Sequence, residues 1–202
     1  MEEDTFRTLT KASEGFYREK GSKFLAFAYP CNEESEAKSH IERLRKEHHN
    51  ACHVCFAWRF GTTRHFDRYS DDGEPSNSAG KPIFGQIQSF ELTNVLIAVV
   101  RYYGGTNLGV GGLINAYKTA AKEALESGKT EERHITTAFK LKHTYDSTGT
   151  VMQLINQVNG NIVEQGYDAP LPFIICLVRQ SLTEKFIETI KNTKDITVET
   201  WT

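Results

Sequence analysis

The sequence predicts an α+β protein of two domains, at residues 1–130 and 131–202. Two patterns lead to this prediction. In the first half, strand-like apolar runs alternate with amphipathic helical stretches, and the β-branched run 94–103 leads through a glycine-rich loop into a helix. In the second half, the expected elements follow the order βαββαβ, which is typical of ferredoxin-like domains. The turn-rich stretch 126–132 separates the two patterns.

The first half is expected to form a sheet with helices on one of its faces. Strand-like patterns occur at 23–30, 51–60, 62–69 and 94–103, and the third of these is polar enough for an edge strand. Helices are expected where Asn32 can cap the apolar stripe of residues 37–48, where Pro82 suits a first turn, and from about Gly112 to Ser127.

The second half alternates as a half-buried strand over residues 135–142, and the helix that follows ends at Asn159-Gly160. The remaining expected elements are strands at 162–167 and 173–179, a helix through 182–190 and a last strand at 196–198. The stretch 173–180 lacks the glycine and surface aromatic residues of an RNP1 motif. The order of elements therefore does not by itself indicate RNA binding.

Composition excludes several classes of protein. The 39% hydrophobic and 25% charged residues are ordinary for a globular chain, and the longest apolar runs are far shorter than the ~20 residues that span a bilayer. The start MEEDTFRTLT lacks the basic and apolar regions of a signal peptide, and the four cysteines are too sparse for a disulfide scaffold. A cytoplasmic protein with free thiols is expected. The net charge of −2 excludes a globally basic nucleic-acid binder but leaves a local patch open.

The strongest local feature is the glycine-rich loop that follows the run 94–103. Its glycines are Gly104, Gly105, Gly109, Gly111 and Gly112. Such a loop before a helix can aim backbone N–H groups at an anion, and Arg101, Lys118 and Lys122 add positive charge. The loop is not a Walker A loop, because Val110 stands where the lysine is required. The glycines can equally serve only tight turns and close packing.

The segment 70–82, SDDGEPSNSAGKP, concentrates acids, hydroxyl groups and glycines. Asp71, Asp72 and Glu74 are oxygen ligands of the kind that Mg²⁺ prefers. A solvated turn before a helix that begins near a proline explains the same composition, and no known metal-binding spacing is present. The metal hypothesis therefore depends on whether the three carboxylates converge in the fold.

Cys52 and Cys55 form a CxxC pair, which raises zinc binding and thiol redox chemistry. The surrounding sequence is strand-like, and in a strand these two side chains point to opposite faces. They are therefore expected to be structural. The same alternation places His53 with Cys55, as the one side chain on that face that titrates near neutral pH, although a lone histidine in a strand is more often a packing residue. No GxSxG motif or catalytic triad stands out.

Three motifs together resemble the IMPACT/YigZ family: AxHxCxA at 51–57, SDDGEPSNSAGKP at 70–82 and VVRYYGGTNLGVGGLINAY at 99–117. The resemblance implies a first domain with the ribosomal protein S5 domain 2-like fold and a second that resembles the ferredoxin-like domains of elongation factor G. It also implies a link to translation, which eukaryotic members of the family regulate. This chain departs from the family at Asn77, where glycine is usual, and at Asn107 and Asn115, where many members carry lysine or arginine. The lost charges weaken a phosphate or nucleic-acid interpretation.

These observations favour a non-catalytic, cytoplasmic, translation-linked regulator that binds a protein or RNA partner. No cofactor or metal is expected. The alternative is a phosphate- or nucleotide-binding enzyme that uses the glycine-rich loop, an acidic Mg²⁺ site and His53 as base. The residues expected to contact a partner or anion are His53, Glu74, Pro75, Ser76, Ser78, Gly80, Arg101, Tyr102, Tyr103, Gly104, Gly105, Gly109, Gly111, Gly112 and Lys118.

Overall fold

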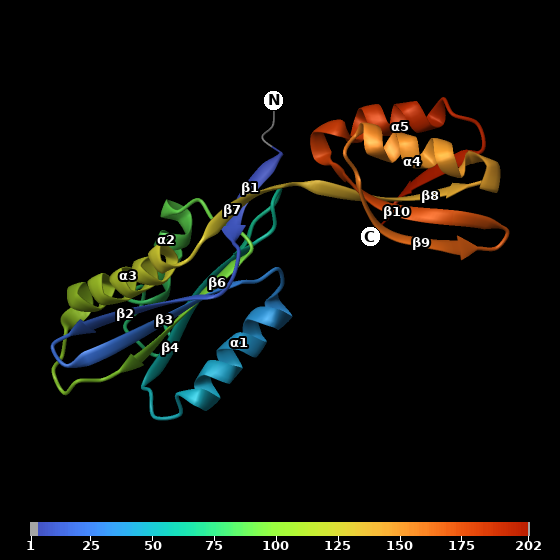
Figure 1. Ribbon diagram of the computed structural model, residues 1–202. Helices are drawn as coiled ribbons and strands as arrows, with labels where there is room; N and C mark the ends of the chain where they lie inside the picture. The colour runs from blue at the N-terminus through green and yellow to red at the C-terminus, as the bar shows by residue number, and fades with distance from the viewer. Residues whose placement is uncertain (1–3, 202) are drawn as a thin grey trace. The chain divides into compact units, whose positions relative to one another are not determined.

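The computed structural model describes residues 4–201, which form two compact units (Figure 1). One unit is Phe6–Arg133. The other joins His134 and the residues after it to the start of the chain, where Asp4 and Thr5 are described. The independent folding of 1–130 and 131–202 stays a prediction. No helix in the described part of the chain is long and apolar enough to cross a membrane.

The first unit is built on a five-stranded sheet in the order β2-β3-β6-β4-β5. All neighbouring strands are antiparallel. The strands are β2 (Ser13–Glu19), β3 (Ser22–Pro30), β4 (His53–Phe60), β5 (Phe66–Ser70) and β6 (Val95–Tyr102). The central strand β6 is buried along seven of its eight residues, which agrees with its continuous β-branched pattern.

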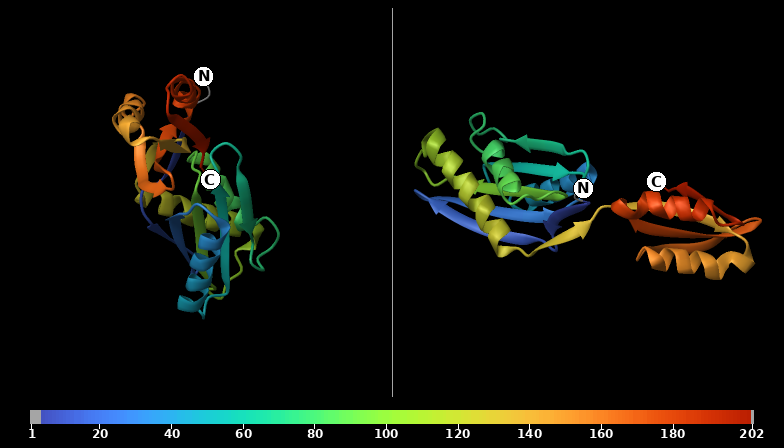
Figure 2. Two further views of the ribbon diagram at one scale, coloured as in Figure 1. Left: turned by 90° about the vertical axis from the view of Figure 1, so that its right-hand side faces the viewer. Right: turned by 90° about the horizontal axis from the view of Figure 1, so that it is seen from above.

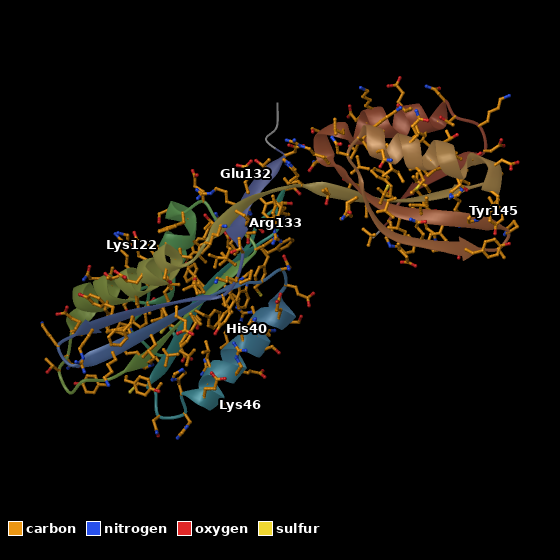
Figure 3. All side chains as sticks on the ribbon, in the orientation of Figure 1. His40, Lys46, Lys122, Glu132, Arg133 and Tyr145 are labelled. Atoms are coloured by element: carbon orange, nitrogen blue, oxygen red, sulfur yellow. The ribbon has the colours of Figure 1, made fainter. Side chains whose placement is uncertain are left out.

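Helices cover both faces of this sheet, so the prediction of helices on one face was wrong. The helices α2 (Gly80–Ser89) and α3 (Gly109–Ser127) lie on one face, and α1 (Glu34–Glu47) lies on the other (Figure 1). In Figure 3, His40 and Lys46 mark α1, and Lys122 marks α3. Alternate residues of β4 enter the two cores: Cys55 packs towards α2 and α3, and Trp58 packs towards α1. Neither face of the central strands is solvated.

Several elements differ from the sequence prediction. The strands β1 (Thr5–Leu9) and β7 (Thr130–His134), which pair with each other, were not predicted, and neither was β2. These strands carry mixed polar and charged side chains, which give a weak strand pattern. The strands β1 and β7 pair across more than a hundred residues of sequence, whereas β2 forms a hairpin with β3.

Three element boundaries also moved. Helix α3 begins at Gly109 rather than Gly112, so Gly111 lies within its first turn. Strand β5 begins only at Phe66, because the chain turns at Gly61, where φ is +90°. The N-cap of α1 is Glu33 rather than Asn32, whose backbone N–H donates to the Glu36 carboxylate instead.

The second unit has one sheet, in the order β11-β8-β10-β9, with α4 and α5 against one face (Figure 2). Its elements, in the order βαββαβ, are β8 (Thr136–His143), α4 (Thr148–Gln157), β9 (Asn161–Asp168), β10 (Leu171–Arg179), α5 (Thr183–Lys191) and β11 (Ile196–Thr200). The short 3-10 turns η1 (Tyr145–Ser147) and η2 (Gln180–Leu182) precede the two helices. Its core has Phe139, Phe186 and Ile155 fully enclosed.

Asp4 fastens the start of the chain to the second unit. Its carboxylate accepts two hydrogen bonds from the Arg179 guanidinium, one of 2.6 Å from Nε, and a third of 3.1 Å from the Ser181 backbone N–H. The hydrogen bonds from Arg179 and Ser181 hold the pKa of Asp4 well below its ordinary value. A carboxyl group with a lowered pKa stabilises the fold when ionised, so this contribution is present above its ordinary pKa and is lost as the pH falls below it.

We expect Asp4→Asn to lower the midpoint of thermal unfolding of the second unit at pH 7. The difference from the parent protein should shrink as the pH falls below about 3.9, the ordinary pKa of an aspartate, because the parent carboxylate is then progressively protonated. The chain has two tryptophans, Trp58 and Trp201, so a Trp58→Phe background leaves fluorescence from the second unit alone. Asp146→Asn, at an exposed acid of the same unit, is the control. An Asp4 effect that is constant down to pH 2 contradicts the proposed linkage.

Candidate functional site

The three motifs meet at one buried carboxylate, that of Glu74. Glu74 lies in the loop between β5 and α2, and its Oε1 accepts hydrogen bonds from Arg101 Nη1 at 2.5 Å and from the Tyr117 hydroxyl at 2.7 Å. The side chains of Glu74 and Arg101 are only 3% and 7% exposed. Strand β6 supplies Arg101 and helix α3 supplies Tyr117. One acid therefore joins a loop, a strand and a helix.

The position of Arg101 follows from the register of the sheet. Arg101 is the partner of Phe24 on β3 and of His53 on β4, so the three side chains form one row on the α3 face. Its guanidinium lies 5.6 Å from the ring centres of both Phe24 and Tyr103, a cation–π arrangement. Its Nε is buried and has no hydrogen-bond partner among the described residues.

His53 is held by the same loop. Its Nδ1 lies 2.7 Å from the carbonyl oxygen of Asp72, and because a carbonyl only accepts, Nδ1 carries the proton. Its Nε2 lies 3.9 Å from Glu74 Oε1. Gly73 passes over the ring with φ at +89°, and a Cβ added there would sit 3.5 Å from the imidazole. His53 thus packs as a half-buried member of the Glu74 network.

Tyr117 and Cys55 complete the network beneath the loop. The Tyr117 hydroxyl lies 3.3 Å from Cys55 Sγ, which also lies 3.0 Å from the carbonyl oxygen of Asp71. Burial raises the pKa of both the Cys55 thiol and the Tyr117 phenol, so both groups are protonated near neutral pH. A protonated thiol is a poor nucleophile, which favours a structural role for Cys55.

The two aspartates of segment 70–82 are occupied by the fold. Asp71 accepts backbone N–H groups from Asn77, Ala79 and Gly80, so it caps the start of α2 from outside the helix. Asp72 accepts the Val54 N–H at 2.7 Å and an Arg45 guanidinium N–H at 2.6 Å.

The three acids proposed for Mg²⁺ therefore point to three different sets of donors. Among residues 4–201, no three metal-ligating side chains converge. The capping role of Asp71 carries no short-range sequence signal, because the acid lies nine residues before Gly80, the first residue of the helix.

The CxxC pair does not form a bidentate site. Cys52, which lies just before β4, is exposed, whereas Cys55 within β4 is fully buried, so the two side chains lie apart. All four cysteines are free. Burial also raises the pKa of Cys31 to about 12 and that of Cys176 to about 11.

The residues predicted to contact a partner fall into two groups. Glu74, Ser78, Gly80 and Arg101 are buried, so any influence they have on a partner is exerted by positioning other groups. The exposed residues are Pro75, Ser76, Tyr103, Gly104, Gly105, Gly109, Gly111 and Lys118, and His53, Tyr102 and Gly112 are partly covered. Tyr102 points to the α1 face, where its hydroxyl lies 2.9 Å from His48 Nδ1.

The glycines of the loop serve different purposes. Gly104 must be small, because a Cβ there would come within 2.1 Å of the backbone at residues 21–22. Gly105 and Gly109 adopt φ of +84° and +71°. Gly111 has neither constraint: its φ is not in the left-handed region and the space around it is open, as it is at Gly85 in α2. The fold alone therefore gives no reason for glycine at position 111.

Asn77 occupies a position where its relatives are expected to carry glycine. Its φ is +60°, in the left-handed region that glycine and asparagine adopt most readily. The departure at this position therefore keeps the loop conformation.

Comparison with known proteins identifies relatives over most of the chain. The model of the Impact N-terminal domain matches residues 20–125. The IMPACT family member YigZ of Escherichia coli is 34% identical over 152 residues, which are 74% of either chain. An IMPACT family member of Haemophilus influenzae is 34% identical over 171 residues, 84% of this chain and 81% of the relative. A crystal structure described as that of a hypothetical protein superimposes with a TM-score of 0.75 at 26% identity, over 98% of both chains.

We expect Glu74→Ala to lower the free energy of unfolding of the first unit by about 3–5 kcal/mol, because it leaves the Arg101 charge buried without a partner. Glu74→Gln should cost less, since its amide oxygen still accepts the Tyr117 hydroxyl. Glu34→Ala is the control, because Glu34 pairs with Arg68 at the surface and its side chain is 48% exposed; its loss should cost less than about 1 kcal/mol. Urea unfolding followed by Trp58 fluorescence in a Trp201→Phe background measures these differences in the first unit, and equal costs for the two alanine variants contradict the network.

Proposed function

Because the chain belongs to the IMPACT family, we propose that it is a non-catalytic regulator linked to translation. It binds a protein or RNA partner through the exposed parts of segments 70–82 and 101–118. The link to translation comes from what the family resemblance implies. The binding role is supported by the geometry of the site.

The observation that carries the binding role is that the acidic side chains of segment 70–82 are bound by groups of the fold itself. Glu74 is bound to Arg101 and Tyr117, Asp71 caps α2, and Asp72 is bound to Arg45. A catalytic site needs a nucleophile, base or acid that can reach a substrate, whereas these groups are committed to the fold. The exposed parts of segments 70–82 and 101–118 include loop backbone, Val110, Tyr103 and Lys118, which is the chemistry of a recognition surface.

We assign the two units to named architectures within the same proposal. The first unit is an S5 domain 2-like domain, as the family resemblance implies. The second is ferredoxin-like, which its βαββαβ order and fully antiparallel sheet order β11-β8-β10-β9 support. Both units act in the cytoplasm.

The proposal gives Gly111 a purpose that the fold does not. A glycine in a helix is less stable than alanine by up to about 1 kcal/mol. Gly111 lies in the exposed first turn of α3 beside the glycine-rich loop, where it leaves the backbone accessible to a partner, whereas Gly85 lies outside the proposed binding segments. We expect Gly111→Ala to raise or preserve the stability of the protein and to weaken partner binding. Gly85→Ala, at an equally open helical glycine on α2, should also preserve stability but leave binding unchanged. Thermal unfolding and partner affinity, measured on both variants, test this pair.

The role in translation is tested in a reconstituted translation system. Added protein should change the rate of reporter synthesis, and Gly111→Glu and Lys118→Glu should abolish that change. Lys122→Glu is the matched control, one turn further along α3, where the lysine pairs with Glu126. No effect of the parent protein, or loss of the effect in the control as well, would contradict the proposed function.

A further inference from the structure

An open groove of about 570 Å³ lies at one end of the first sheet, mainly on its α1 face. It shares one residue with the surroundings of the Glu74 network, Tyr103, whose ring lies 5.6 Å from the Arg101 guanidinium. Strands β2 and β3 supply four of its eight lining residues, and His48, which directly follows α1, is another. The lining residues are Phe16, Arg18, Gly21, Lys23, Leu25, His48, Tyr102 and Tyr103. Its volume lies in the range of about 300–1,000 Å³ that ligand sites occupy.

Two cations stand directly opposite each other in this groove. Arg18 on β2 is the register partner of Lys23 on β3, and both side chains are exposed. Neither forms an ion pair with any residue of the part of the chain that the structure describes. Like charges at directly opposed positions destabilise a sheet, so the fold gains nothing from this pair. The arrangement is instead complementary to an anion.

Aromatic rings accompany the cations. Phe16, two residues before Arg18 on the same face of β2, is 56% exposed, and Tyr103 is 49% exposed. Tyr102 is the register partner of Lys23 on the other side, and its hydroxyl is fixed by His48 at 2.9 Å. An exposed phenylalanine on a sheet costs solubility and contributes little packing. Rings beside cations provide surfaces on which unpaired bases stack while the cations bind phosphates.

Acidic residues lie away from this end of the groove. On β2, Glu14 shares the face of Phe16 and Arg18, but its register partner is Phe27, four pairs along the ladder from the Arg18–Lys23 pair. Glu19 points to the other face, where it accepts the Tyr17 hydroxyl. The groove is therefore locally basic in a chain whose net charge is −2.

We propose that this groove binds single-stranded RNA, with Arg18 and Lys23 on successive phosphates and with Phe16 and Tyr103 stacked on bases. The groove is open, whereas a site for a free nucleotide encloses most of its ligand. Its exposed rings require bases that are not already stacked in a duplex. The choice of RNA over single-stranded DNA rests on the proposed link to translation, whereas the groove itself is argued from its charge and its rings.

The test is fluorescence anisotropy of the full chain with a labelled 12-nucleotide poly(U) RNA. The expected result is salt-dependent binding that Arg18→Gln/Lys23→Gln weakens about tenfold or more, with a slope of log K against log salt that is shallower by about 1.4, or about 0.7 for each cation removed. Phe16→Ala should weaken binding about fivefold or more.

The matched control is Lys11→Gln/Lys129→Gln, which removes the same charge from exposed lysines near the opposite end of β2. It should bind RNA as the parent does, within about twofold of its affinity, with a smaller change of slope. The Arg18→Gln/Lys23→Gln variant should unfold at the same temperature as the parent or higher, because it relieves a like-charge pair. Retained stability with lost binding separates recognition from folding.

Four outcomes would overturn the proposal: no RNA binding by the parent protein, equal losses in the groove and control variants, equal affinity for a duplex RNA, and displacement of the RNA by UMP at comparable concentration. Equal affinity for the matched poly(dT) strand would overturn the choice of RNA. The proposed function is tested separately, by the Gly111 and Lys118 variants in the translation assay, because those residues lie outside the groove. A failure of the RNA proposal can therefore be distinguished from a failure of the proposed function.

Discussion

The first unit depends on one buried ion pair, that of Glu74 and Arg101. Glu74 lies in a loop of glycines, serines and acids, which has little apolar surface of its own to bury. Its carboxylate is acceptable inside the protein only because Arg101 supplies the opposite charge and Tyr117 a hydroxyl donor. Each of these partners is in turn positioned by the sheet or by α3. The loop, the central strand and the long helix are therefore fixed with respect to one another by one polar cluster.

The same sheet produces two different surfaces because β6 alternates between them. Arg101 faces α3 and forms an ion pair with Glu74, whereas the next residue, Tyr102, faces α1 and borders the groove. Helix α1 covers β4 and β6 but not the ends of β2 and β3 next to the groove. On the α3 face, the charge of Arg101 is paired with Glu74. On the α1 face, Arg18 and Lys23 lie at the end of the sheet that α1 leaves uncovered, and no ion pair with a described residue neutralises them. That contrast separates the structural cluster from the surfaces available to a partner.

Much of the fold could be predicted from local patterns. The β-branched run of β6, the apolar stripes of the helices and the separation of Cys52 from Cys55 all follow from periodicity. The polar strands β1 and β7 could not be predicted, because they are stabilised by pairing with each other across most of the first unit rather than by their own residues. Strand β2 was missed because its polar and charged residues give a weak strand pattern, although it forms a hairpin with β3. The sequence also did not predict that helices cover both faces of the sheet, because the pattern of a strand does not indicate which helix packs against which of its faces.

The sequence by itself determined which segments carry the candidate site, since its motifs mark 51–57, 70–82 and 99–117 without reference to any contact. Only the tertiary structure decided what the charged residues in them do. Asp71, Asp72 and Glu74 read alike in the sequence, yet one caps a helix, one binds Arg45 and one is buried against Arg101. The physical reason is that the role of a carboxylate depends on the hydrogen-bond donors that reach it. Here those donors come from strands and helices that only folding brings together.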